Sequence, residues 1–202
     1  SVGVHEIAFR GPLKAGKNTR SAGEDIQIGQ VLFRKGRKIR TSDLAVLASV
    51  GISQLKVYWP LRVGILSTGD ELIEPGELAR VGQIYDANRP MLIGQMVELG
   101  YDIVDLGRAE DDAETLRSIL NSAAERCDAL ITTGGASAGD EDHMSALLRD
   151  SGSLEMWRIA VKPGRPMAMG LWNGLPVFGL PGNPVAAMVC ALVFTQPALR
   201  TL

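Results

Sequence analysis

The sequence predicts an α/β protein with a mostly parallel sheet, preceded by a small β-rich segment. Residues 61–202 alternate apolar, strand-like runs with amphipathic helical stretches, whereas residues 1–60 are rich in glycine and charge. Helices that separate apolar strands imply right-handed crossovers and a parallel sheet covered on both faces. We therefore expect a β-rich segment over residues 1–60 and an α/β domain over residues 61–202.

The first segment shows the pattern of short strands and turns. Alternating apolar positions such as Ile26, Ile28 and Val31 lie between glycines and charged residues, as in small strands. A helix is expected after the potential cap residues 41–43, and a short strand over residues 55–59. This part is too short to build a large core by itself.

The α/β domain contains five strand-like runs, at residues 61–66, 101–107, 128–133, 155–161 and 176–180, with a further apolar run, PMAMGLW, before the last. One helix is expected over PMLIGQMVELG, with Asn88 as its cap and Gly100 at its end. Another is expected over LRSILNSAAERC, where Asp111 and Glu114 have the spacing of a capping box.

Polar loops follow all five runs, where open α/β sheets bind their ligands, outside the carboxyl ends of the strands. The loops contain Thr68, Gly69, Asp70 and Glu71; Glu110, Asp111 and Asp112; Gly134, Gly135, Ser137, Asp140 and Asp142; Lys162, Gly164 and Arg165; and Pro181, Gly182, Asn183 and Pro184. One such loop means little, but five that meet at one edge predict a binding site.

Each loop also has a purely structural interpretation. The stretch 68–70 is equally typical of a turn closed by an Asx hydrogen bond. Asp111 is also suited to capping a helix, and Asn183 followed by Pro184 is a favourable helix start. Lys162 and Arg165 flank a Pro-Gly turn, where they also suit a solvated surface. These alternatives stay open from the residues alone.

Charge and apolar patterning exclude several classes of protein. The formal net charge is −2 without a long basic run, so a nucleic-acid surface is not expected. The longest apolar run, residues 185–194, is about half of a membrane span, and no signal peptide opens the chain. Cys127 and Cys190 are far apart and form no CxxC, which is typical of a reducing compartment. We expect a cytoplasmic protein that binds neither membranes nor nucleic acid.

Several well-known catalytic signatures are missing from the sequence, namely GxxxxGK[ST], GxGxxG after a strand, GxSxG and HExxH. What remains is a set of carboxylates, backbone amides and cations. Carboxylates repel phosphates unless a divalent metal bridges them, and Mg²⁺ suits oxygen ligands shared between protein and phosphate. The sequence therefore predicts a metal-assisted reaction on a phosphorylated small molecule, with Lys162, Arg165 or Arg158 holding an additional anion.

Five motifs carry a family resemblance: STGDEL, GQIYDANRP, TTGGASAGDED, WRIAVKPGRP and GLPGNPV, in this order. Together they resemble the molybdopterin molybdenumtransferases of the MoeA type, which include the gephyrin E domain. The resemblance covers residues 61–202 strongly, and the preceding segment is also similar to that of the family. It implies a three-layer α/β molybdopterin-binding (MoCF) fold. It also implies Mg²⁺-dependent insertion of molybdate into adenylylated molybdopterin, with release of AMP.

Particular residues inherit roles through this resemblance. Glu71, Asp111 and Asp142 look like the family's catalytic or metal-handling acids, and Lys162 looks like its anion-binding lysine. The resemblance assigns the other loop residues to binding of the pterin nucleotide or oxyanion, namely Thr68, Gly69, Asp70, Gly134, Gly135, Ser137, Arg158, Arg165, Pro181, Gly182, Asn183 and Pro184. Arg158 is a departure, because the family often has lysine there and arginine is a planar fork rather than a compact charge.

The resemblance also concerns assembly and extent. Family members are dimers with active sites between subunits, so a homodimer is implied. They usually carry more chain upstream, and a β-barrel-like domain after the position of Leu202. Two alternative functions stay open, a molybdopterin adenylyltransferase and a non-catalytic, gephyrin-like scaffold. The retained acids weigh against the scaffold, and the long first segment weighs against the adenylyltransferase.

Overall fold

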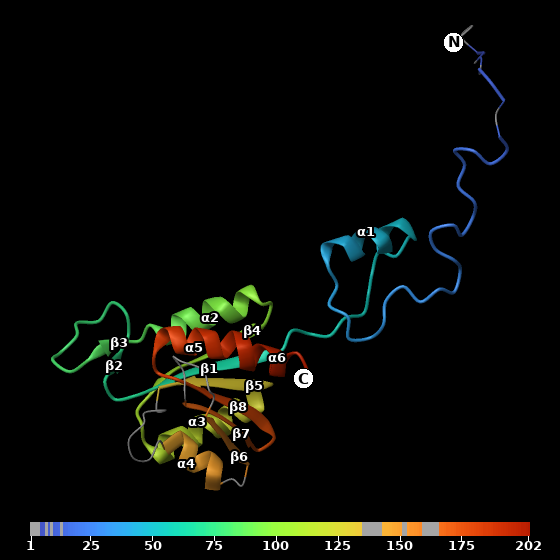
Figure 1. Ribbon diagram of the computed structural model, residues 1–202. Coiled ribbons are helices and arrows are strands. Elements are labelled where there is room, and N and C mark those ends of the chain that lie inside the picture. Colours follow the sequence, from blue (N-terminus) through green and yellow to red (C-terminus); the bar gives the residue numbers. More distant parts are fainter. Residues whose placement is uncertain are drawn as a thin grey trace. The chain divides into compact units, whose positions relative to one another are not determined.

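The computed structural model describes most of the chain and divides it into two compact units, Ser1–Val57 and Tyr58–Leu202. The described residues are 5, 6, 8, 10–12, 14–134, 143–150, 153–158 and 166–202, with the backbone alone at 154–158 and 166. Figure 1 shows the elements of both units in sequence colours.

The first unit contains one helix among its described residues, α1 (Thr41–Ser49). Asp43 in its first turn is buried and accepts hydrogen bonds from the Arg37 guanidinium (2.7 and 3.1 Å) and the Arg40 amide (3.0 Å). The Arg37 hydrogen bonds, followed by that of the Arg40 amide, hold the pKa of the Asp43 carboxyl below its ordinary value. The predicted helix is confirmed, but it begins at Thr41, so residues 41–43 form its first turn instead of capping it from outside.

The β-rich character expected of this segment is not seen. No strand is assigned to the described residues before Arg62, including residues 55–59, where a strand was expected. The side chains of Ile28 and Val31 are exposed. The physical reason is that apolar alternation only permits a strand, whereas a stable strand needs a paired neighbour and a packed face.

The second unit is built on a six-stranded sheet in the order β4-β1-β5-β8-β7-β6. The strands are β1 (Arg62–Thr68), β4 (Asp102–Ala109), β5 (Ala129–Thr133), β6 (Leu154–Arg158), β7 (Pro166–Trp172) and β8 (Leu175–Leu180). β4, β1, β5 and β8 run parallel, and β7 is antiparallel to both β8 and β6. The prediction of a mostly parallel sheet is confirmed.

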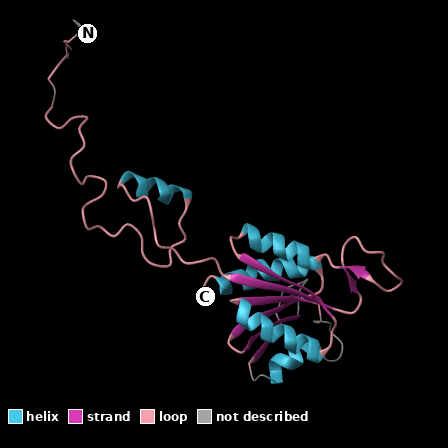
Figure 2. Cartoon of the chain, turned by 180° about the vertical axis from the view of Figure 1, so that it is seen from behind, coloured by secondary structure: helices cyan, strands magenta, loops and turns pink. Residues whose placement is uncertain are grey.

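Helices cover both faces of the sheet, as Figure 2 shows, and give three layers. α2 (Asn88–Glu98) and α5 (Pro184–Cys190) pack against one face, where Leu92 and Met96 meet Val63 and Ile65 of β1. α3 (Ala113–Arg126) and α4 (His143–Asp150) pack against the other face, around Leu66 of β1. The side chains of β1 alternate between these two cores, as the period-2 geometry of a strand requires.

After α5 the chain continues as a π-helical turn (Ala191–Thr195) and a short helix, α6 (Gln196–Leu199). Pro197 lies in α6 and has no amide hydrogen to donate to the preceding turn, which favours a local change in the helical hydrogen-bond pattern. Among the described helices, none is both long and apolar enough to cross a membrane.

An excursion between β1 and α2 was not predicted from the sequence. It contains two short parallel strands, β2 (Leu72–Ile73) and β3 (Ile84–Tyr85), which Figure 1 shows beside the start of α2. The amide of Ile84 donates to the carbonyl of Glu71 (2.8 Å), and the amide of Asp86 donates to that of Ile73 (2.9 Å). This small ladder holds Glu71 at the base of the excursion.

Two helix starts differ from the sequence expectation. Asp112 rather than Asp111 caps α3, and its carboxylate accepts from the amide of Thr115 at 2.8 Å. Asp86 accepts from the amide of Arg89 at the start of α2, whereas the Asn88 side chain makes no cap hydrogen bond. Both errors are shifts of one or two residues between neighbours with similar capping ability. The expected end of α2 at Gly100 is confirmed by its left-handed φ of 89°.

Candidate functional site

The ends of four neighbouring parallel strands define one edge of the sheet. Thr68 at the end of β1 pairs with Ala109 of β4, and Thr133 at the end of β5 pairs with Leu180 of β8. Ser67 pairs with Thr133 and joins the two halves. The loops that follow these strands therefore leave the sheet at the same level, where a ligand crevice is expected in an open α/β fold.

The loops after β1 and β5 approach each other so closely that a side chain is excluded between them. Gly134 has a φ of +93°, and a Cβ atom built on it would lie 1.8 Å from the carbonyl oxygen of Thr68. Only glycine combines this left-handed backbone with this contact. Residue 134 must therefore be glycine for steric reasons alone, independently of any ligand.

The acidic loop after β1 is tied to the loop after β4. The amide of Gly69 donates to the carbonyl of Ala109 (3.3 Å), and the amide of Asp111 donates to Oδ1 of Asp70 (3.1 Å). The Glu71 carboxylate folds back over Gly69, with its atoms 3.0–3.2 Å from the position of a Cβ on that glycine. The structure therefore brings Asp70, Glu71 and Asp111 to one place, with Asp70 and Glu71 exposed and Asp111 half-buried.

The loop after β8 begins the helix α5. Asn183 caps it by accepting a hydrogen bond from the amide of Ala186 (3.1 Å), and Pro184 is its first residue. The structural interpretation of Asn183 and Pro184 is thus correct. Pro181 is buried, whereas Gly182 is exposed at the same edge.

Asn88 is a residue of this edge that the sequence did not single out for the site. Its Nδ2 donates to Oγ1 of Thr133 (2.7 Å) and to the carbonyl of Gly182 (2.8 Å). The Asn88 side chain, at the start of α2, thereby joins the end of β5 to the loop after β8. The motif GQIYDANRP was noticed, but its asparagine was interpreted as a helix cap, because partners 45 and 94 residues away leave no local signal.

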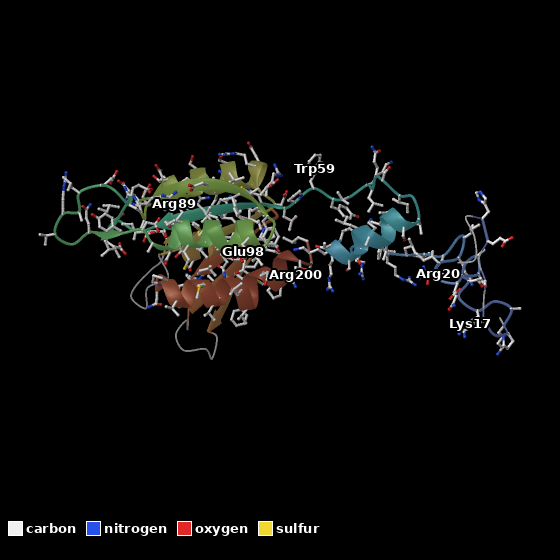
Figure 3. All side chains as sticks on the ribbon, turned by 90° about the horizontal axis from the view of Figure 1, so that it is seen from above. Lys17, Arg20, Trp59, Arg89, Glu98 and Arg200 are labelled. Carbon is white, nitrogen blue, oxygen red and sulfur yellow. The ribbon has the colours of Figure 1, made fainter. Side chains whose placement is uncertain are left out.

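Arg89 is the centre of an ion-pair cluster beside Asn88. Its guanidinium contacts the carboxylates of Asp105 (2.7 Å), Asp86 (3.3 Å) and Glu74. Burial lowers the pKa of Arg89, but the carboxylates, led by Asp105, outweigh it and leave that pKa above its ordinary value. Figure 3 shows Arg89 where α2 begins. The cluster fastens the β2–β3 excursion and β4 to α2.

Several predicted site residues lie outside the described part of the chain, namely Gly135, Ser137, Asp142, Lys162 and Arg165. Arg158 is described as backbone, and it pairs with Pro166 at the start of β7. Since β6 and β8 are both antiparallel to β7, β6 ends at the same edge as the parallel strands. Arg158 and Pro166, which flank residues 159–165, therefore lie at this edge.

Within the described residues, no group of three His, Cys, Asp or Glu side chains is arranged to hold a metal ion. Magnesium, however, is usually held by one or two carboxylates together with substrate phosphates and water. Glu71 and Asp111, on loops joined through Asp70, are compatible with such a site. The oxygen donors fit Mg²⁺ but not a soft metal, which prefers thiolate or imidazole.

Comparison with known proteins identifies the family. A family model described as "Probable molybdopterin binding domain" matches residues 64–201, and one described as "MoeA N-terminal region (domain I and II)" matches residues 2–51. The chain belongs to the MoeA family. The resemblance noted in the sequence is thereby confirmed, and the matched molybdopterin-binding domain lies within the three-layer unit.

Several relatives of this MoeA-family chain are named molybdopterin molybdenumtransferase. The Haemophilus influenzae protein is 39% identical over 97% of the chain and 48% of its own length, and molybdopterin molybdenumtransferase 2 of Mycobacterium tuberculosis is 37% identical over 98% and 50%. The crystal structure of the molybdopterin biosynthesis MoeA protein of Pyrococcus horikoshii superposes with a TM-score of 0.75 at 34% identity, over 89% of this chain and 44% of that one. The chain thus spans about half the length of the curated relatives it matches.

Proposed function

We propose that this chain acts in molybdenum cofactor biosynthesis, inserting molybdate into adenylylated molybdopterin with release of AMP. The observation that carries the proposal is the hydrogen bond between Asp70 and the amide of Asp111, which joins two acidic loops at the ligand edge of a MoeA-family domain. Relatives named molybdopterin molybdenumtransferase support the same reaction.

In this proposal the acidic loops and the glycine loops have different tasks. Glu71 and Asp111, with Asp142 from outside the described residues, would hold Mg²⁺, which would supply positive charge to offset that of the phosphates. Backbone amides near Gly134 and Gly182 approach the pterin nucleotide, because glycine leaves the backbone uncovered. Lys162, Arg165 and Arg158 supply the positive charge that holds the oxyanion. Asp70 positions the Asp111 loop through its hydrogen bond.

The test is to incubate the chain with adenylylated molybdopterin, molybdate and Mg²⁺ and to measure AMP by chromatography. AMP that depends on both molybdate and Mg²⁺ is the expected result. A second reaction with ATP and plain molybdopterin distinguishes an adenylyltransferase, which would consume ATP and form pyrophosphate. Binding of the pterin nucleotide without product in either reaction would favour a scaffold. Absence of both binding and AMP release would rule out the proposed function for this chain.

We further propose that the chain works as a homodimer in the cytoplasm. The two cysteines of the described chain are free and buried, as suits a reducing compartment. Light scattering on the purified chain would give the molar mass, and a monomeric mass at micromolar concentrations would contradict the dimer. Fractionation of cells that express the protein tests the compartment.

A further inference from the structure

A buried hydrogen-bond network lies beneath the first turn of α2. It consists of Asn88, Thr133 and the carbonyl groups of Pro181 and Gly182, and we call it the Asn88 network. Asn88 is 8% exposed and Thr133 is 1% exposed. Hydrogen bonds in such a low-dielectric setting are strong and costly to break. Oδ1 of Asn88 has no hydrogen-bond partner among the described residues, so the network is held by the amide nitrogen and the Thr133 hydroxyl.

The donors and acceptors of the Asn88 network can be assigned from chemistry. The carbonyl of Gly182 only accepts, so the side-chain atom of Asn88 that lies 2.8 Å from it is the nitrogen. The second proton of this amide goes to Oγ1 of Thr133 at 2.7 Å. The hydroxyl proton of Thr133 then turns towards the carbonyl of Pro181, at 3.5 Å. Both amide protons of Asn88 and the hydroxyl proton of Thr133 are therefore donated within the network.

The consequence is a fixed relation between two ligand loops. Thr133 immediately precedes Gly134, whose backbone is already confined by Thr68. Pro181 and Gly182 form the loop that starts α5. The Asn88 side chain, on α2, thus sets the distance between the backbone amide of Gly134 and the backbone amides that follow β8. Because these backbone segments are already ordered before binding, less conformational entropy is lost when a ligand contacts both.

We infer that Asn88 is a positioning residue that holds the end of β5, at Thr133 and Gly134, and the loop after β8 in the arrangement needed to bind the pterin nucleotide. The inference rests on the proposed function for the identity of the ligand. The residue acts through Thr133 and Gly182 and does not itself touch the reacting atoms. Asn88 is neutral, so a search for charged or metal-binding side chains, which finds the acids and the lysine, would not identify it.

The experiment compares binding of adenylylated molybdopterin, measured by calorimetry, among variants of the full chain. Asn88→Leu and Thr133→Val remove the polar groups at similar volume, and each is expected to weaken binding about tenfold or more. Thr133→Ser keeps the hydroxyl and is expected to restore binding to within about twofold of the unmodified chain. Because both substitutions break the same network, the Asn88→Leu/Thr133→Val double variant should bind the nucleotide only slightly less tightly than the single variant with the lower affinity.

Ser67→Ala is the matched control. Ser67 lies in the same layer, is fully buried, and its Oγ has no hydrogen-bond partner among the described residues. Its removal should leave binding unchanged. All titrations are made at a temperature where circular dichroism shows each variant to be folded, so a purely structural role would lower the unfolding midpoint without altering the affinity.

Amide hydrogen exchange of the ligand-free chain separates this inference from the proposed function. Thr133→Val should accelerate exchange at residues 134, 182 and 183 together, whereas Thr133→Ser and Ser67→Ala should not. Unchanged exchange, or equal nucleotide affinity of Thr133→Val and Thr133→Ser, would overturn the inference even if Asn88→Leu fails to fold. Failure of the unmodified chain to bind the nucleotide, with coupled exchange intact, would instead count against the proposed ligand.

Discussion

The carbonyl oxygen of Thr68 lies 1.8 Å from the point that a Cβ atom on Gly134 would occupy. Even the smallest side chain at residue 134 must therefore displace the end of β1 or the loop after β5. We expect Gly134→Ala to abolish binding of the pterin nucleotide and to destabilise the fold by several kcal/mol, since both neighbouring groups are backbone. Urea unfolding and nucleotide titration measure the two effects.

Gly174→Ala is the control for this substitution. Gly174 also has a positive φ, of +86°, but a Cβ on it meets nothing within 4 Å. It should cost only about 1–2 kcal/mol for the left-handed backbone, and nucleotide binding should persist. Equal costs for the two variants would show that the close approach to Thr68 relaxes easily.

Asp111 and Asp112 are neighbours with separable tasks. Asp112 caps α3 through the amide of Thr115, so Asp112→Ala should measurably lower the free energy of unfolding and leave nucleotide binding intact. Asp111→Asn keeps its backbone amide for Asp70 and removes a carboxylate charge. It should weaken Mg²⁺-dependent binding of the nucleotide at least tenfold with little change in stability. A loss of stability in Asp111→Asn, together with a loss of nucleotide binding in Asp112→Ala, would show that Asp111 is the cap.

Arg89 neutralises Asp86, whose side chain is 1% exposed. Arg89→Met would leave that carboxylate buried without its cation, and we expect a loss of about 3–5 kcal/mol in the free energy of unfolding. Adding Asp86→Asn should recover part of the loss, because the uncompensated charge is then gone. Arg62→Met, which breaks the more exposed pair with Asp128, should lower the free energy of unfolding much less than Arg89→Met. Similar losses from the two arginine variants would show that burial of the cluster is unimportant.

Asp128 gives a pH dependence to folding. The hydrogen bonds of the Arg62 guanidinium hold the pKa of the Asp128 carboxyl below its ordinary value. A carboxyl with a lowered folded pKa stabilises the fold above its unfolded pKa, about 3.9, and that contribution is lost as the pH falls through the folded value. Asp128→Asn should therefore reduce stability at pH 7 and make progressively less difference below about pH 4. If the stability difference between Asp128→Asn and the unmodified chain grew as the pH fell, the predicted sign of the linkage would be wrong.

The mostly parallel sheet and its layers could be predicted to a large extent because they depend on patterns close in sequence, whereas the strand order came only from the structure. Apolar runs, helical periodicity and crossover handedness together predict a parallel sheet covered on both faces. Strand ends were less accurate. The run predicted at 101–107 is β4, which spans Asp102–Ala109, whereas residues 159–161 of the run predicted at 155–161 lie outside the described residues.

The candidate site was predicted in location rather than in detail. Asp70, Glu71 and Asp111 meet because their strands share one register, which the topology alone implies. The ladder of β2 and β3 was missed, since a two-residue strand has no periodicity to detect. The metal-binding and catalytic roles of these residues, and of Asp142 and Lys162, stay predictions.

The sequence by itself determined that five polar loops follow the strands of an α/β domain and which family that domain resembles. Both depend on residues adjacent in the chain, whose effect on backbone and pattern is local. Only the tertiary structure decided that Gly134 must be glycine, that Asp112 rather than Asp111 caps α3, and that Asn88 spans two loops. These depend on atoms brought within a few ångströms from distant parts of the chain, and packing forces act over that distance alone.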